Sequence, residues 1–268
     1  MTDLGKRNLL GVLVDALDYE AAVQRIISAA LDGRPYAVTA LAVHGLMMGA
    51  KDRIHRHRLN SLDLVTPDGQ PVRWALNWIH GVALKDRVYG PDLMFRVCEE
   101  AARRDLSVYL YGSRLEVVDS LARSLKARMP AVRLAGSEPS VFRVLKLKEK
   151  NALVARIQRS GARIVFVGLG CPRQEVFIYE IRKALGIPVI AVGAAFEYRS
   201  GFRREPQPWV QRAGLQWVHR MLHEPVRLWK RYLISNAAFL ARLSLQLTGL
   251  IHPDPSDTTP PVREQSFG

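Results

Sequence analysis

Four polar residues carry side chains that could do chemistry at the ends of apolar runs or in the turns after them. They are Thr39 in YAVTAL, Asp68 in TPDGQPVRW, Arg87 in DRVYG and Gln174 in VGLGCPRQE. A carboxylate such as Asp68 can accept a proton from a hydroxyl, and an arginine fork matches phosphate oxygens. Asp68 also has an ordinary interpretation, because Thr-Pro-Asp-Gly is turn chemistry and Asp commonly caps helices. Taken alone, TPDGQPVRW favours the turn and cap.

Glycines stand just past several apolar runs and mark a second kind of candidate site. They are Gly112 after SVYLY, Gly168 and Gly170 in VFVGLG, and Gly193 in AVGAAF. In VGLGCPRQE the glycine turn leads into a helix start, where exposed amides can bind an anion. The alternative is that these glycines only permit tight turns. The pattern is neither the GxGxxG dinucleotide fingerprint nor a P-loop.

Metal and serine-hydrolase motifs are missing from the sequence. There is no Asp-x-Asp pair, no His-Glu-x-x-His, no Cys-x-x-Cys and no Gly-x-Ser-x-Gly. The cluster RIHRHR at 53–58 contains two histidines, but its neighbours are cationic. We therefore expect a solvated basic turn there rather than a metal site.

The elements that must position these residues follow from the apolar pattern. The pattern predicts strands at 9–17, 36–41, 62–66, 107–112, 132–136, 163–170 and 188–196. It predicts helices at 19–32, 44–51, 69–79, 92–104, 114–128, 148–159 and 173–185. Strands that alternate with helices predict parallel pairing through crossover helices. We expect a Rossmann-like α/β fold, a doubly wound and mostly parallel sheet. Ligands bind such sheets in the crevice outside the strands' carboxyl ends.

The pattern changes after Phe196, where no further strand is predicted. Two helical stretches follow, at about 207–222 and 225–249, and the end of the chain is rich in Pro and Ser. We expect three parts. They are an α/β catalytic domain at 1–197, a basic amphipathic helical appendage at 198–250 and a disordered tail at 251–268.

The charge of the chain indicates an anionic partner. The 268 residues carry a formal net charge of +14. Between Arg199 and Arg231 there are eight Lys or Arg against two Glu, together with three tryptophans. This mixture suits a membrane surface, and it also suits nucleic acid. No signal peptide or membrane-spanning run is apparent, and the two distant cysteines predict a reducing compartment.

Five segments together resemble one family. TPDGQPVRWA, DRVYGPDLM, VYLYGS, VFVGLGCPRQE and the stretch 192–233 resemble, in the same order, the WecG/TagA/CpsF glycosyltransferases (glycosyltransferase family 26) over roughly residues 35–240. The resemblance implies an inverting, metal-independent, cofactor-free transfer of a sugar from a nucleotide donor, typically UDP-linked, to a polyprenyl-diphosphate-linked acceptor. It implies surface-polysaccharide assembly by a cytoplasmic protein that is peripheral on the inner face of the bacterial cell membrane.

The resemblance also implies roles for the polar residues. Asp68 matches the family's catalytic Asp and would be the base. Arg87 matches the site arginine and would hold the diphosphate; the alternative is a surface ion pair with Asp86. Gln174 matches the family's Pro-Lys-Gln-Glu block, in which Arg173 replaces the usual Lys.

The nucleotide sugar is expected to meet a second set of residues. They are Thr39, Gly112, Gly168, Gly170 and Glu197, the last standing where the family often has Asp and holding the ribose or base. For Thr39 the alternative is an ordinary strand threonine. In the appendage Arg212, Arg220, Arg227 and Arg231 match recurrent arginines, which would reach the diphosphates or lipid headgroups; the alternative for each is a solvated helix face.

Departures from the family pattern leave the donor sugar open. Ala42 stands near a position where many members have Asn, and Arg73 replaces a common apolar residue. His44 could replace a lost polar contact, or simply start a helix. A homo-oligomer is possible. Two other classes compete with the transferase, namely a nucleic-acid-binding protein suggested by charge and an oxidoreductase on the same sheet. Neither has its signature in the sequence.

Overall fold

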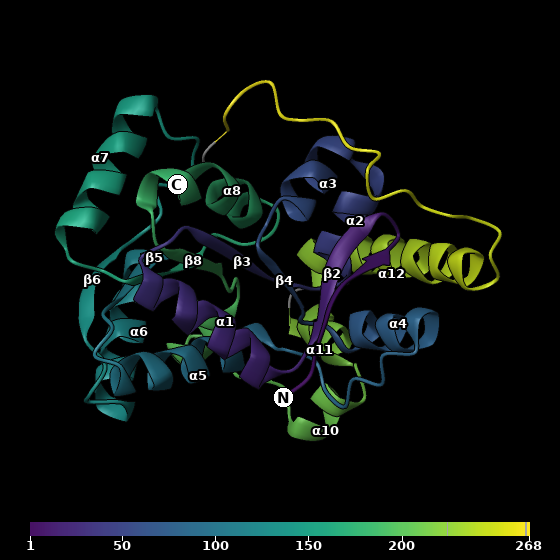
Figure 1. Ribbon diagram of the computed structural model, residues 1–268. Helices are drawn as coiled ribbons and strands as arrows, with labels where there is room; N and C mark the ends of the chain where they lie inside the picture. Colours follow the sequence, from purple (N-terminus) through teal and green to yellow (C-terminus); the bar gives the residue numbers. More distant parts are fainter. Residues whose placement is uncertain (224, 266) are drawn as a thin grey trace.

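The computed structural model describes the backbone of residues 1–223, 225–265 and 267–268, with the side chains of these except 220, 223, 225 and 227–233. Among the described residues six strands form the central sheet (Figure 1). They are β3 (Tyr36–Leu41), β4 (Leu64–Pro67), β5 (Val108–Gly112), β6 (Leu134–Glu138), β7 (Ile164–Gly168) and β8 (Pro188–Ala191). Their order is β4-β3-β8-β7-β5-β6, and each neighbouring pair is parallel. The predicted Rossmann-like, doubly wound sheet is confirmed.

Helices cover both faces of this sheet, as Figure 1 shows. One face packs against α1 (Tyr19–Asp32), α5 (Gly90–Arg103) and α6 (Leu115–Arg128). The other packs against α2 (Val43–Lys51), α3 (Arg53–Asn60), α4 (Gln70–His80), α7 (Leu147–Arg159) and α8 (Arg173–Leu185). Along β7, Val165 and Val167 face one core and Phe166 faces the other, all fully buried. A strand buried on both faces reads as a continuous apolar run, which is why these strands were predictable.

The first expected strand, at 9–17, is wrong in form. The chain instead makes an antiparallel hairpin of β1 (Asp3–Leu9) and β2 (Val12–Leu17), apart from the six-stranded sheet. Leu10 and Gly11 connect the strands with φ angles of 53° and 88°. Two consecutive positive φ angles are the geometry of a tight hairpin turn. Because the first of these positions is a leucine, Leu10, the turn continues the apolar run and was not recognised in the sequence.

After β8 the chain is helical in its described part. It forms α9 (Ala195–Arg199), α10 (Pro208–Arg212), α11 (Gln216–His223) and α12 (Pro225–Leu247). Phe239 and Leu243 of α12 are 2% exposed and belong to the core that α2 and α4 also line. The last helix therefore contributes to the same hydrophobic core as the α/β part of the chain. None of the helices, as far as their residues are described, has the length and apolarity to cross a bilayer.

The C-terminal tail contacts other parts of the chain. In Figure 1 it (yellow) runs along the outside of the molecule past α3 and back toward α8. The Pro253 and Pro255 carbonyls accept hydrogen bonds from Asn8 and Asn60, and the Thr259 amide donates to the Arg53 carbonyl at 3.2 Å. A Pro-rich composition is compatible with this course, because an extended segment is held by contacts with the rest of the protein and needs no internal backbone hydrogen bonds.

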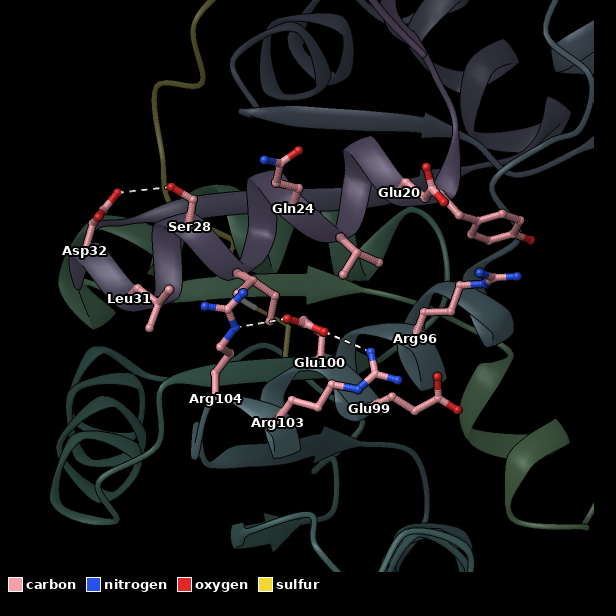
Figure 2. A pocket seen from close by; sticks show the side chains of 13 residues that line it. Glu20, Gln24, Ser28, Leu31, Asp32, Arg96, Glu99, Glu100, Arg103 and Arg104 are labelled. Carbon is pink, nitrogen blue, oxygen red and sulfur yellow. Dashed lines mark hydrogen bonds and ion pairs between the residues drawn. The ribbon is translucent and has the colours of Figure 1, made fainter. Parts of the chain in front are cut away.

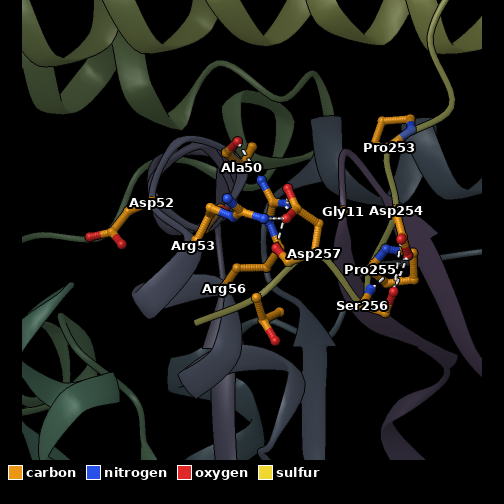
Figure 3. Close-up of polar contacts among 12 residues, drawn as sticks. Gly11, Ala50, Asp52, Arg53, Arg56, Pro253, Asp254, Pro255, Ser256 and Asp257 are labelled. Atoms are coloured by element: carbon orange, nitrogen blue, oxygen red, sulfur yellow. Dashed lines mark hydrogen bonds and ion pairs between the residues drawn. The ribbon is translucent and has the colours of Figure 1, made fainter. Parts of the chain in front are cut away.

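The RIHRHR segment is helix α3 and not the solvated basic turn that we expected. His55, Arg56 and Arg58 are buried. Arg56 donates to the carbonyls of Gly49, at 3.0 Å, Ala50, at 2.8 Å, and Asp257, at 3.0 Å. Figure 3 shows Asp257 of the tail beside this guanidinium. Burial is possible because carbonyl oxygens satisfy its fixed fork of donors.

Candidate active site

A cleft of about 600 Å³ opens at the carboxyl ends of the strands, a size typical of small-molecule sites. Its lining includes Asp68, Gly168, Gly170, Gln174 and Glu197, all of them predicted site residues. The appendage contributes Gln216 and Trp217 to the same cleft. The sheet topology thus brings together residues from three strand ends that are far apart in the sequence.

Asp68 lies where β4 ends, and its carboxylate is held in a fixed orientation. Its amide donates to the Leu41 carbonyl at 3.2 Å, and its Oδ1 accepts the Gly90 amide at 2.8 Å. Gly90 begins α5, so Asp68 caps that helix, whereas α4 begins after Gly69 without a side-chain cap. The expected cap is real but serves a different helix. Asp68 is half-buried in the cleft lining, so capping and a catalytic role are compatible.

Gln174 is fixed through a carboxylate behind it. Its Oε1 accepts the Gly170 amide at 3.2 Å, and its Nε2 donates to Glu175 Oε1 at 2.9 Å. Thr39 Oγ1 donates to the same Glu175 oxygen at 3.0 Å. Thr39 is fully buried and is absent from the cleft lining, contrary to our expectation that it lines the pocket. Glu175, 1% exposed, was missed; its place beside Gln174 in the first helical turn was the available signal.

Arg87 is buried rather than free in the cleft. It is 4% exposed, its Nη2 donates to Gln211 Oε1 at 2.9 Å, and its Nη1 donates to Gln216 Oε1. The surface ion pair with Asp86 is not what the structure contains, because Asp86 Oδ1 instead accepts the Arg87 backbone amide at 2.8 Å. Arg87 therefore fastens the appendage to the catalytic domain, and its contact with a diphosphate stays a prediction.

The glycines divide between lining and packing. Gly168 and Gly170 line the cleft, whereas Gly112 does not. A Cβ on Gly112 would lie 2.8 Å from the Gly168 backbone carbon, and the φ of Gly112 is +118°. Only glycine allows this close approach of β5 and β7. The role of Gly112 is thus to let two strand ends meet beneath the loop.

Two further features of the cleft are the ion pair of the predicted Glu197 and an exposed aromatic ring. The Glu197 carboxylate pairs with Arg203 at 3.1 Å. Phe142, which the sequence analysis missed, lines the cleft with a ring that is more than half exposed. An exposed aromatic face is suited to stack a planar base.

The remaining candidates lie around or outside the cleft. Arg212 is exposed on α10 and is absent from the lining, while the side chains of Arg220, Arg227 and Arg231 lie outside the described residues. Ala42 and His44 line the cleft. Arg73 does not, because its guanidinium donates to the Leu84 and Lys85 carbonyls, both at 2.8 Å. In the described part of the chain no three His, Cys, Asp or Glu side chains form a group that could hold a metal.

A second groove, of about 660 Å³, runs between α1 and α5 on another part of the surface (Figure 2). Several of its polar groups pair with each other. Glu100 pairs with Arg103 and Arg104, each at 3.0 Å, and Ser28 donates to Asp32 at 3.4 Å. No strand end or glycine loop contributes to its lining. The cleft at the strand ends is therefore the candidate active site.

Comparisons with known proteins agree with this geometry. The family described as "Glycosyl transferase WecG/TagA/CpsF family" matches residues 7–252. A curated relative from Bacillus subtilis (strain 168) is 28% identical over 184 residues, which are 68% of this chain and 69% of the relative. That relative is an N-acetylglucosaminyldiphosphoundecaprenol N-acetyl-beta-D-mannosaminyltransferase. The match over most of the chain, together with the cleft that unites its motifs, shows that this protein belongs to the WecG/TagA/CpsF family and is a glycosyltransferase.

Proposed function

We propose that the protein transfers a sugar from a UDP-linked donor to a polyprenyl-diphosphate-linked acceptor, with inversion and without a metal. The observation that carries this proposal is the Asp68 carboxylate, oriented by the Gly90 amide inside a cleft at the strand ends. The relative's name supports a lipid-diphosphate acceptor that carries N-acetylglucosamine. It also makes N-acetylmannosamine the first donor sugar to test.

The reaction would need one base and one displacement. Asp68 accepts the proton of the acceptor hydroxyl while that oxygen forms its bond to the anomeric carbon, and the bond from this carbon to the donor's phosphate oxygen breaks on the opposite face. The UDP leaves with its electron pair, and the configuration inverts. A single positioned base is sufficient for this step.

The leaving diphosphate needs positive charge or hydrogen-bond donors. The loop from Gly168 to Gly170 and the first turn of α8 lie at the cleft, and Arg173 is part of the lining. A helix start favours a negative charge near its amides. The proposal places the diphosphate there, and the uridine toward Phe142 and Glu197 at the cleft margin.

The lipid acceptor implies that the protein works at the inner face of the cell membrane as a peripheral protein. Large apolar side chains are exposed on successive elements of the appendage: Trp209 is 62% exposed, Leu222 is 73% exposed and Val226 is 90% exposed. Exposed apolar groups combined with a net charge of +14 suit an anionic membrane surface.

The test is UDP release from a panel of UDP-sugars in the presence of a short-chain polyprenyl-diphosphate N-acetylglucosamine acceptor. We expect one donor to turn over only when the acceptor is present, with or without chelator. Folded protein that neither binds nor turns over any UDP-sugar, but binds oligonucleotides, would contradict the proposal and favour the nucleic-acid-binding class.

A further inference from the structure

Tyr89 lines the cleft immediately before Gly90, the residue whose amide binds Asp68. Its side chain is only 6% exposed, and its hydroxyl has no hydrogen-bond partner among the described residues. Buried hydroxyl groups in native proteins are almost always hydrogen-bonded, because an unpaired one loses its water without replacement. In a cleft, the missing partner can be a group of the ligand.

The ring and the backbone of Tyr89 are each held by a neighbouring residue. The Arg87 guanidinium lies 4.3 Å from the centre of the Tyr89 ring, and the Tyr89 backbone amide donates to Tyr19 Oη at 3.0 Å. Tyr89 is also the N-cap residue of α5, the helix that Asp68 caps with its carboxylate. Tyr89 and Asp68 are thereby held in one rigid unit, as substrate-binding groups must be to discriminate between ligands.

The surroundings keep the hydroxyl protonated. Burial raises the pKa of Tyr89 well above its ordinary value, and Tyr198, Asp68 and Glu205 raise that pKa further, against an opposing effect of Arg87. At neutral pH the group is thus a hydrogen-bond donor. The neighbouring carboxylates disfavour a second anion at this point, so a neutral hydroxyl suits it better than a phosphate oxygen.

We propose that Tyr89 donates a hydrogen bond from its hydroxyl to a sugar hydroxyl beside Asp68, and that it thereby helps to select the sugar. This inference rests on the proposed function. Both the donor sugar and the acceptor's terminal sugar carry neutral hydroxyls at the reacting centre, so either can supply the partner.

The test compares full-length Tyr89→Phe with the full-length wild-type protein on natural and monodeoxy sugars. The variant keeps the ring under Arg87 and removes one hydroxyl. We expect kcat/KM to fall by about 2- to 13-fold, the range for one neutral hydrogen bond, with an unchanged or higher melting temperature. With the deoxy sugar that lacks the partner hydroxyl, the two proteins should become equal. A deoxy donor that has this effect assigns the partner to the donor, and a deoxy acceptor assigns it to the acceptor.

Tyr179→Phe is the matched control. Tyr179 also lies beneath an arginine, with Arg182 4.2 Å from its ring centre, but it is on α8 and outside the cleft lining. It should behave like the wild type. The inference would be overturned if Tyr89→Phe had the same kcat/KM as the wild type on every sugar, or if it lost equally on the natural and all deoxy sugars. In either case, transfer by the wild-type protein would leave the proposed function intact. A wild-type protein that binds and transfers no sugar overturns both.

Discussion

The Glu175 carboxylate lies in the wall of the cleft, almost fully buried, and binds the side chain of Gln174. One of its oxygens accepts hydrogen bonds from both Thr39 and Gln174. The Oε1 atom of Gln174 in turn accepts a hydrogen bond from the Gly170 amide. A change at Glu175 can therefore displace the Gln174 side chain even though Gln174 itself is unchanged. Sequence patterns reveal Gln174 as a candidate, but only the packing of α8 against β3 reveals this support.

We predict that Glu175→Ala lowers both the stability and the turnover of the enzyme. The substitution leaves two buried donors without an acceptor, which costs about 1–3 kcal/mol for each unpaired group, and it releases the Gln174 amide. Thr39→Val is the control, since it removes one donor and should cost about 1 kcal/mol with little change in kcat. Urea unfolding and UDP release measure the two effects. A Glu175→Ala enzyme with wild-type values of both would refute this role.

At the scale of elements, the helices are joined by contacts between distant parts of the chain. Arg56 of α3 binds two carbonyls at the end of α2 and one of the C-terminal tail, at Asp257. Arg53 also pairs with Asp257, but its side chain is 62% exposed. The tail thus closes over a buried guanidinium, and this explains why a Pro-rich segment has a defined course.

Arg56→Lys should destabilise the fold by about 1–3 kcal/mol, because an ammonium group cannot reach three carbonyls in the plane of a guanidinium. The same change at Arg53, Arg53→Lys, should cost less than about 0.5 kcal/mol, as expected of an exposed pair. Urea unfolding gives both values, and limited proteolysis should show earlier cleavage within 252–265 for the Arg56 variant only. If the two substitutions destabilised the protein equally, burial of the guanidinium would not be the reason that Arg56 stabilises the fold.

The sequence predicted the elements that depend on local pattern and missed the features that depend on distant partners. The sheet and most helices follow from apolar periodicity, and five of the predicted site residues line one cleft. The hairpin turn was hidden by a leucine with positive φ. The burial of Arg87 depends on Gln211 and Gln216, more than 120 residues away, and no local signal announces them.

At the scale of the whole molecule, the cleft and the exposed apolar side chains both involve the appendage. Gln216 and Trp217 of α11 line the cleft, while Leu222 of the same helix and Trp209 of α10 are exposed. An enzyme that takes a lipid-linked acceptor needs such an arrangement, because the reacting sugar must enter the cleft while the lipid stays in the bilayer. On the proposed function, the segment expected to face the membrane is the same one that contributes to the cleft.

Sedimentation with anionic vesicles tests this arrangement. We expect the protein to bind vesicles of phosphatidylglycerol, to bind less at high salt, and to lose about tenfold or more in affinity in Trp209→Ala/Leu222→Ala, since each large apolar group is worth about 1.5–3 kcal/mol when buried. Leu31→Ala, at an exposed site on α1, is the control. Vesicle binding that is unaffected by the double substitution would exclude this face as the membrane contact.

The central claim is that Asp68 is the base, and the most direct measurement is the rate of UDP release by Asp68→Asn with donor and acceptor both saturating. An asparagine oxygen can still accept the Gly90 amide, so the fold and the cap of α5 should survive. We predict a loss of about 10²–10⁴-fold in kcat at an unchanged melting temperature. The control is Asp86→Asn, which changes a nearby exposed carboxylate outside the cleft lining and should leave kcat close to the wild-type value. Turnover by folded Asp68→Asn within a few-fold of wild type would contradict the account.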